Sequence, residues 1–328
     1  MEVSHGQLTQ FLESRVLQAP PGHNFQLADY TALRAPAVDH AGPYETDDAF
    51  SVDCSRRGAF LVRVFIADGS QLAHHAKVFA DAALKGESSY GPQKKDVDPL
   101  YPEPLIRQYE LPGRSLVLTR TFNADAVPTG KVAFELGLVR TVPMTPDTFI
   151  RRYGPSEKRE AAPVVAFATK WAQRMSLRHG GRLGPQNDPA KFGMAVVQTY
   201  NTLVNLSANR LAVNEGIPLL NRAFNPSQLF WNERRGQYAA YAVYASSRSP
   251  HHGIRRNMAV MNPRVSAPMR RWIDTFNHIQ IGLALQGTEP PFSVSDTEEI
   301  ADCFNFMRLG GEPPSLMTYA GRIAEQAS

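Results

Sequence analysis

Strand patterns and helix patterns occupy different halves of this chain, and this separation limits the folds open to it. Residues 60–67 (FLVRVFIA) form a continuous β-branched and aromatic run, which predicts a buried strand. Similar runs predict strands at 49–52, 115–122 and 131–140. Helical periodicity is found at 4–18 and 71–85 and then dominates the second half, at 148–153, 164–178, 191–215, 267–286 and 297–308. Strands followed by helices, without regular alternation, predict an α+β fold.

Two stretches, 88–105 and 221–265, are expected to be loops because turn-forming residues interrupt any periodicity there. The sequence contains no uncharged apolar run long enough to span a bilayer, so no membrane partner is expected. The polar first residues do not resemble a secretory signal. The two cysteines, Cys54 and Cys303, provide neither a disulfide framework nor zinc spacing, and they are typical of reduced thiols in a cytoplasmic protein.

Charge is distributed unevenly along the chain, although the formal net charge is only +4. Residues 221–280 contain nine arginines and no lysine, with Glu233 and Asp274 as the acids of that region. Residues 39–53 have the opposite character, with five acids and no basic residue. An arginine-rich region together with an acidic cluster suits a polyanion that is bound through its phosphates and cut at a metal. The alternative is that both regions are solvated surface.

The acidic cluster places four carboxylates within ten residues: Asp39, Glu45, Asp47 and Asp48. Gly42 and Pro43 bend the chain between the first acid and the other three, so a loop could bring all four together. Carboxylate oxygens are the ligands that Mg²⁺ prefers. Three interpretations remain open from spacing alone: a catalytic metal site, a calcium or other structural ion site, and an acidic surface loop. The residue order does not fit an EF-hand.

Two motifs far apart in the chain carry a resemblance to a known family. Asp39 precedes the run 45–49 (ETDDA) by six residues, which resembles the RNB signature of the ribonuclease II and ribonuclease R family. The second motif is 266–274 (SAPMRRWID) followed by His278, and it is similar to the Thr-Ser-Pro-Ile-Arg-Arg-Tyr-x-Asp…His motif of the same family. Weaker similarities lie at 64–68, 88–90, 99–105 and 111–118. The resemblance covers roughly residues 27–286.

This resemblance implies an RNB-like fold, in which a β core is wrapped by helices and a channel leads to a buried acidic site. Residues 1–26 are then an N-terminal helical extension, 27–286 the catalytic domain, and 287–328 a C-terminal helical extension of that domain. The implied activity is metal-dependent hydrolysis of RNA phosphodiester bonds from the 3′ end. The implied substrate is single-stranded RNA, or special RNA ends, and the implied cofactor is Mg²⁺, with Mn²⁺ as an alternative.

The resemblance also implies roles for individual residues. The metal ligands are the four acids Asp39, Glu45, Asp47 and Asp48, and Asp47 is the one on which activity depends most. Arg270 is expected to contact the scissile phosphate, with Asp274 as its ion-pair partner one helical turn later, and Pro268 is expected to begin that helix. The remaining RNA contacts are expected from Tyr90, Arg271 and Asn205.

For several of these residues a structural role competes with the functional one. Tyr90 could be a loop aromatic that packs on the core, and Arg270 and Arg271 could be a surface pair. His278 is interpreted as a packed structural histidine, and Asp68 as a group that caps the end of a strand.

The chain departs from the family pattern at positions that bear on activity. Glu45 stands where the family has Asp, and Pro146 stands where the family has a tyrosine. Gln198 and Thr199 replace a pair of acids, whereas Asn205 is retained. Family members usually carry cold-shock and S1 domains, for which the flanking segments leave no room. We therefore expect weak intrinsic RNA binding, or a partner protein that delivers RNA.

Three functions remain open from the sequence. The first is a 3′→5′ exoribonuclease or RNA-end hydrolase, and the second is a catalytically degenerate RNB-fold protein that binds RNA in a regulatory role. The third is a metal-dependent hydrolase of a different substrate, because a fold does not fix the substrate. The sequence leaves the oligomeric state open.

Overall fold

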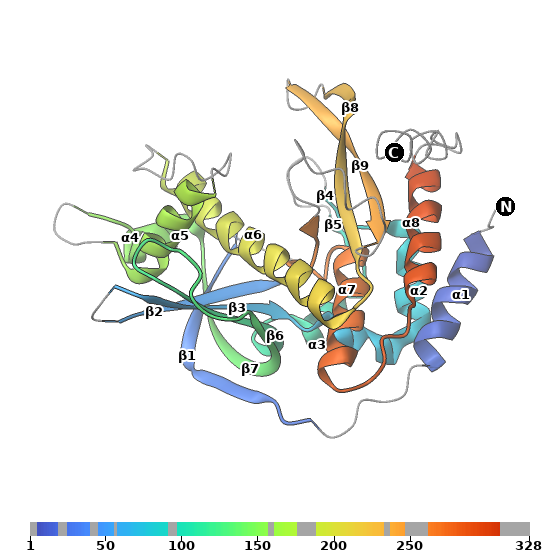
Figure 1. The fold of residues 1–328 in the computed structure, drawn as a ribbon, viewed down its shortest axis with the longest axis horizontal. Helices are drawn as coiled ribbons and strands as arrows, with labels where there is room; N and C mark the ends of the chain where they lie inside the picture. The colour runs from blue at the N-terminus through green and yellow to red at the C-terminus, as the bar shows by residue number, and fades with distance from the viewer. Residues whose placement is uncertain are drawn as a thin grey trace.

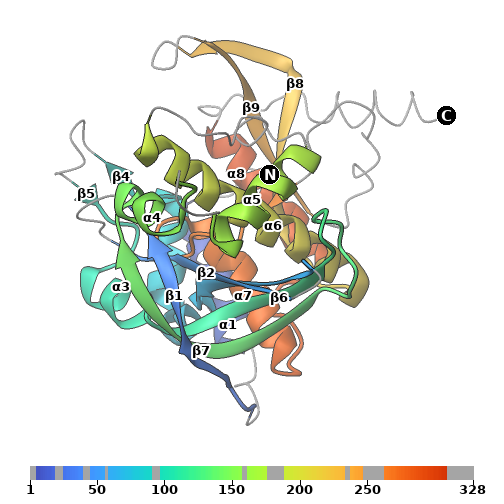
Figure 2. The same ribbon diagram turned by 90° about the vertical axis from the view of Figure 1, so that its left-hand side faces the viewer.

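The computed structural model describes residues 5–18, 25–39, 45–55, 58–90, 97–156, 161–175, 188–232, 237–246 and 262–308. The main sheet has five strands in the order β1-β7-β6-β3-β2. Their bounds are β1 (Ala28–Val38), β2 (Asp48–Cys54), β3 (Phe60–Ala67), β6 (Gly113–Phe122) and β7 (Ala133–Met144). Strand β1 pairs in parallel with β7, and the other pairs are antiparallel. The two edge strands, β1 and β2, also approach each other, so the sheet curves into a nearly closed barrel (Figure 2).

Both faces of this sheet are buried, which explains the uninterrupted apolar run of β3. Val64 faces one core cluster and its neighbour Phe65 faces the other, because successive strand residues point to opposite faces. In β6, Leu118 likewise faces the first cluster and Val117 the second. The first cluster is completed by α5 (Pro163–Arg174) and α6 (Pro189–Glu215), and the second by α2 (Ala76–Lys85) and α7 (Trp272–Leu285). Figure 1 shows these two groups of helices on different sides of the sheet.

The remaining helices lie around this framework. They are α1 (His5–Gln18), the 3₁₀ helix η1 (Gly69–His75), α3 (Glu103–Tyr109), α4 (Pro146–Tyr153) and α8 (Val294–Arg308). Helix α1 packs Leu12 into the second cluster, and Arg15 forms a 2.8 Å ion pair with Asp296 of α8. Both terminal helices thus contact the same core, while the domain boundaries remain a prediction. None of the described helices has the length and hydrophobicity needed to cross a bilayer.

Two small sheets flank the main one. The hairpin of β8 (Leu220–Asn232) and β9 (Gln237–Ser246) projects from the fold and is joined by β10 (Asn262–Pro263) (Figure 1). The other small sheet pairs β4 (Ser89–Tyr90) with β5 (Val97–Asp98).

The α+β fold class and most predicted elements are confirmed, and the errors have physical causes. The prediction of a loop at 221–265 is wrong for the hairpin β8–β9, and 88–105 contains β4, β5 and the start of α3. Strand β1 was not predicted, because it contains Pro36 and its register shifts between Tyr30 and Ala35. Proline is tolerated there because β1 lies at the edge of the sheet. The helix predicted at 267–286 begins only at Trp272.

Tyr200 gives a test of how α6 is anchored. Its ring stacks on Phe50 at a centroid distance of 4.4 Å, and its hydroxyl donates a 2.5 Å hydrogen bond to the Val164 carbonyl. We expect Tyr200→Phe to lower the free energy of unfolding by about 1 kcal/mol and Tyr200→Ala by about 3–5 kcal/mol. Chemical denaturation would measure both. Val213→Ala on the exposed face of α6 is the control and should change stability by no more than about 0.5 kcal/mol; an equal loss there would contradict the assignment.

Candidate metal centre and phosphate-binding turn

The acidic segment lies where β1 ends and β2 begins, and backbone hydrogen bonds fix it there. Asp39 directly follows β1, and its N–H donates to the Met144 carbonyl at 3.0 Å. Asp48 is the first residue of β2. The carbonyl of Asp47 accepts a 2.7 Å hydrogen bond from the N–H of Ala67. The sheet thus brings Asp39 and the run 45–48 to neighbouring strand ends.

Asp47 is the buried centre of this group, with 6% of its surface exposed. Its Oδ1 accepts a 3.0 Å hydrogen bond from the backbone N–H of Met269. Its Oδ2 accepts no hydrogen bond and lies 3.5 Å from Nε of Arg270. The two family-like motifs of the sequence therefore meet at this carboxylate.

The neighbouring acids are held by residues from other elements. Oδ2 of Asp48 accepts a 2.8 Å hydrogen bond from the side-chain amide of Asn201 on α6. Glu45 is 4% exposed, and its Oε1 lies 3.5 Å from the hydroxyl of Ser88. The predicted carboxylates are therefore supported from the strand ends, from the segment after α2, and from α6.

The electrostatics of the site disfavour charge on Asp47 and Asp48. Burial raises the pKa of Asp47 to about 8, against the opposing effects of Arg270 and Met269, and Glu45 and Asp48 raise it further. Burial likewise raises the pKa of Asp48 to about 6, with Asp39 adding to the rise and Asn201 opposing it. The acids thus act on one another, and Arg270 does not offset the cost of burying Asp47.

A divalent cation fits the chemistry of this donor set, which offers carboxylate oxygens, one of them buried without a hydrogen bond. As the side chains stand, however, no three His, Cys, Asp or Glu groups among the described residues are placed so that they could share a metal ion. Residues 40–44 lie outside the described part of the chain, between the first ligand candidate and the others. Metal binding would therefore require the carboxylates to turn toward a common point.

The second motif forms a turn rather than the start of a helix, which corrects the prediction for Pro268. Residues 268–270 form a turn, and α7 begins at Trp272, after Arg271 in an extended conformation. In the structure the partner of Asp274 is Arg271, with Nη2 and Oδ2 2.9 Å apart, whereas Arg270 faces Asp47. Asp274 also accepts a 2.8 Å hydrogen bond from the N–H of Ala267. This buried aspartate thus closes the turn that presents Arg270.

The two arginines of the turn have different surroundings. The Arg270 side chain is 41% exposed, while that of Arg271 is 13% exposed and also donates a 3.0 Å hydrogen bond to Ser266 Oγ. Arg270 is therefore placed to meet a ligand at the acidic site, and Arg271 stabilises the turn. Because Arg271 is mostly buried and holds the turn, its predicted contact with RNA at the acidic site remains a prediction.

Asn205 and Tyr90 were also predicted to contact RNA. Asn205 is buried and its Oδ1 accepts a 2.9 Å hydrogen bond from the N–H of Val265, so it positions the segment before the turn. Its contact with RNA remains a prediction, as does that of Tyr90, whose backbone lies in β4 and whose side chain is outside the described part of the structure.

The structural interpretations of His278 and Asp68 agree with the contacts. His278 is buried, with Nδ1 accepting from the N–H of Gly69 at 3.3 Å and Nε2 donating to the Val265 carbonyl at 2.7 Å. Burial lowers the pKa of His278, which matches a neutral ring. Asp68 caps η1 by accepting from the N–H of Ser70 at 3.0 Å, and it pairs with Arg114 at 2.5 Å.

Asn201 and Ser88 were not predicted as site residues. An asparagine in the middle of a long helix carries no spacing signal, and its role becomes visible only when α6 is placed beside β2. The neighbouring Gln198 is exposed, and Thr199 is buried with its hydroxyl bonded to the Ala195 carbonyl at 2.8 Å. Neither replaces the lost acids as a ligand in this arrangement, so α6 supplies an amide to the site.

Neither a family model nor a curated protein sequence matches the chain. Among solved structures, RNase R of Mycoplasma genitalium is similar at a TM-score of 0.64 and 16% identity, over 92% of this chain and 59% of that one. An active-site mutant of the Dss1 exoribonuclease of Candida glabrata is similar at 0.63 and 14%, over 92% and 49%. Yeast Ssd1, described as a pseudonuclease, is similar at 0.67 and 14%, over 88% and 44%.

The structure therefore has the fold of the RNB-type exoribonucleases, as the sequence resemblance implied. The chain spans about three fifths of the length of the RNase R chain, with 59% of it covered. At these identities the likeness defines the fold and leaves the activity to be argued from the site. A channel leading to the acidic site remains a prediction.

Asp47→Asn should stabilise the metal-free protein at neutral and higher pH, because it removes a carboxyl group that the folded state must keep protonated at a cost in free energy. The pKa of Asp47 in the folded state, about 8, lies above the ordinary 3.8, so the folded state holds this proton more tightly than the unfolded state does. The tighter binding of this proton stabilises the folded state fully at a pH below the ordinary pKa of 3.8. This stabilisation is lost as the pH rises toward about 8. With chelator, we expect the wild type to lose stability over this range and Asp47→Asn to lose less.

Thermal unfolding would measure this effect. At the upper end of the pH range we expect Asp47→Asn to melt higher by at least about 2 °C, on the order of 1 kcal/mol. Added Mg²⁺ should raise the melting temperature of the wild type only. Asp53→Asn, an exposed acid at the far end of β2, is the matched control and should resemble the wild type. A melting temperature of Asp47→Asn below that of the wild type in chelator would contradict the interpretation.

Substitution of the two arginines of the turn should have different effects: loss of Arg271 should lower stability, and loss of Arg270 should weaken ligand binding. Arg271→Ala leaves the fully buried Asp274 without its cation, and we expect a loss of about 3–5 kcal/mol in chemical denaturation. Arg270→Ala removes a half-exposed side chain and should cost less than about 1 kcal/mol, while weakening binding of an anionic ligand. Equal losses of stability for the two variants would show that the turn does not depend on Arg271 in this way.

Proposed function

We propose that this protein hydrolyses RNA phosphodiester bonds with the help of Mg²⁺ or Mn²⁺, and that it acts from the 3′ end of single-stranded or special RNA ends. The observation that carries this proposal is the Asp47 carboxylate, buried beside other acids with its Oδ2 unbonded and facing Arg270. Clustered buried acids destabilise a protein unless a cation offsets them. A protein without use for a cation at this place would be more stable with neutral residues there.

The choice of RNA as substrate is supported by the fold and by charge. RNase R, a protein with this fold, has been solved in complex with single-stranded RNA. In this chain Arg270 is exposed next to the acids, and its guanidinium suits a phosphate oxygen better than a lysine would. The arginine-rich composition of residues 221–280 adds to the attraction for a polyanion.

Each residue of the site has a place in the proposed reaction. Asp39, Glu45, Asp47 and Asp48 would hold the metal, which when bound supplies an activated water and a counter-charge for the leaving oxygen. Arg270 orients the scissile phosphate and stabilises the negative charge that develops on it. Asn201 and the Met269 N–H hold Asp48 and Asp47 in place. A partner protein that delivers RNA remains part of the proposal.

A second candidate function is a catalytically inactive RNA-binding protein. The likeness to Ssd1, described as a pseudonuclease, favours it, and so does the absence, among the described residues, of three side chains already grouped for a metal. The loss of two acids at Gln198 and Thr199 points the same way. Against it stands the retention of the four carboxylates, which would repel RNA if no cation were bound.

A gel assay on single-stranded RNA labelled at either end, with Mg²⁺, Mn²⁺ or chelator, distinguishes the two. We expect metal-dependent release of nucleotides from the 3′ end, a loss of about 100-fold or more in Asp47→Asn, and wild-type rates in the control Asp53→Asn. RNA that is bound but uncut with every metal would support the inactive binding protein instead. Cleavage that persists in Asp47→Asn would place the chemistry elsewhere.

A further inference from the structure

A short two-stranded ribbon forms a wall beside the acidic site. It consists of residues 86–88, after α2, paired with residues 270–272, before α7. The N–H of Ser88 donates to the Arg270 carbonyl at 2.9 Å, and the N–H of Trp272 donates to the Gly86 carbonyl at 2.8 Å. Glu87 and Arg271 are directly opposite each other in this antiparallel pairing.

The two faces of the ribbon look onto different places. Side chains alternate along an extended segment, so neighbours point to opposite sides. Ser88 and Arg270 face the acidic site, at 3.5 Å from Glu45 and 3.5 Å from Asp47 respectively. Glu87 and Arg271 instead line a cavity behind the ribbon.

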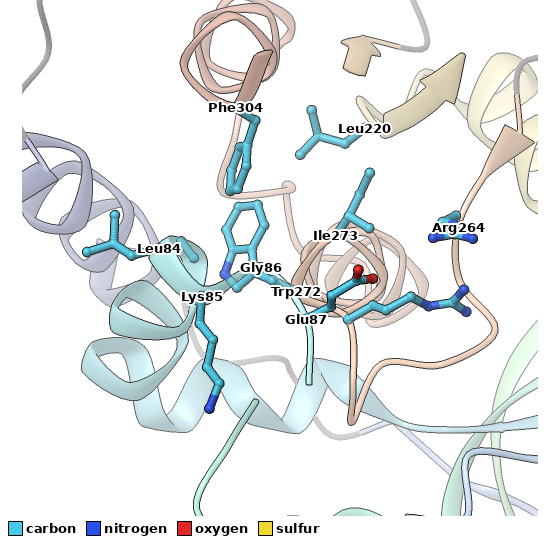
Figure 3. Close-up of a pocket in the computed structure, with 11 residues that line it drawn as sticks. Leu84, Lys85, Gly86, Glu87, Leu220, Arg264, Trp272, Ile273 and Phe304 are labelled. Carbon is cyan, nitrogen blue, oxygen red and sulfur yellow. The ribbon is translucent and has the colours of Figure 1, made fainter. Parts of the chain in front are cut away.

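This cavity has a volume of about 290 Å³, close to the lower end of the range for small-molecule sites. One end is apolar, where Phe304 stacks on Trp272 at a centroid distance of 4.9 Å and Ile273 and Leu220 lie nearby (Figure 3). Arg264 lies at the other end (Figure 3). A molecule with an apolar ring and an anionic group would match both ends.

The charges of the lining favour an anion at the polar end. Arg264 and Arg271 repel each other, and although Nη2 of Arg271 pairs with Asp274 at 2.9 Å, its Nε donates no hydrogen bond. Burial lowers the pKa of Arg271 to about 10, against the opposing effect of Asp274. Glu87 is the acid of the described lining and is exposed, so it can accept hydrogen bonds from a ligand.

We propose that this cavity is a second binding site and that it takes a nucleoside monophosphate. The phosphate lies between Arg264 and Arg271, and the base packs against Phe304 and Ile273. Glu87 accepts hydrogen bonds from ribose hydroxyls or from a base amino group, which an inorganic anion could not provide. Hydrolysis of RNA from its 3′ end would release molecules of this class, but binding here does not depend on that activity.

Calorimetric titration of the full chain in chelator tests the proposal, with AMP and UMP compared with adenosine, ribose 5-phosphate and inorganic phosphate. We expect the nucleotides to bind at least about 10-fold more tightly than adenosine or phosphate. Arg264→Ala should weaken AMP binding by about 10-fold or more, and the control Arg174→Ala, an exposed arginine on α5, should not. No AMP binding, or equal affinity for AMP and adenosine, would overturn the proposal.

Two further variants keep the result interpretable. Glu87→Ala changes an exposed residue and should lower the preference for AMP over phosphate by about 10-fold, even if Arg264→Ala proves to be poorly folded. Asp47→Asn should bind AMP nearly like the wild type, because the acidic site lies on the other face of the ribbon and Asp47 has only a small electrostatic effect on Arg271. Loss of AMP binding in Asp47→Asn would place the nucleotide in the acidic site and overturn the proposal. The RNA cleavage assay is independent of every one of these outcomes.

Discussion

The hydrogen bond from the Met269 N–H to Asp47 joins two parts of the chain that are 222 residues apart, and the rest of the site depends on it. It fixes the acidic segment at the start of β2 against the turn that precedes α7. The same turn places Arg270 beside the carboxylate and Arg271 against Asp274. The barrel-like sheet supplies the acids, and the helical half supplies the Arg270 guanidinium and the Met269 N–H donor.

The energetic design of the site is unfavourable locally and is tolerated because the surroundings are well packed. Asp47 and Asp274 are both buried, and Asp274 is held by the Arg271 guanidinium at 2.9 Å, whereas the Arg270 guanidinium lies 3.5 Å from Asp47. The two apolar clusters, one on each face of the sheet, offset the free-energy cost of these buried acids. Departures from the rules of a stable interior are expected where a protein binds or reacts.

The sequence predicted what depends on local pattern and missed what depends on tertiary placement. Strand β3 was predicted with its observed bounds because both its faces are apolar, and the acids could be proposed as a group because they are close in sequence. Strand β1 was missed because its Pro36 and its register shift break the alternation that marks a strand. Asn201 could not be found, since only the packing of α6 brings its amide to Asp48. The start of α7 was misplaced because Asp274 accepts a hydrogen bond from the Ala267 N–H and closes a turn there.

The distance in sequence between Asp47 and Met269 also bears on how the protein is made. A chain emerging from a ribosome presents the sheet and its acids long before the turn that carries Arg270. Contacts of such long range are formed late, because the entropy of closing the intervening loop must first be overcome. During synthesis the acidic strand ends therefore exist without their arginine and without the backbone donor. In a protein with this arrangement the site is assembled only once the second half has folded onto the first.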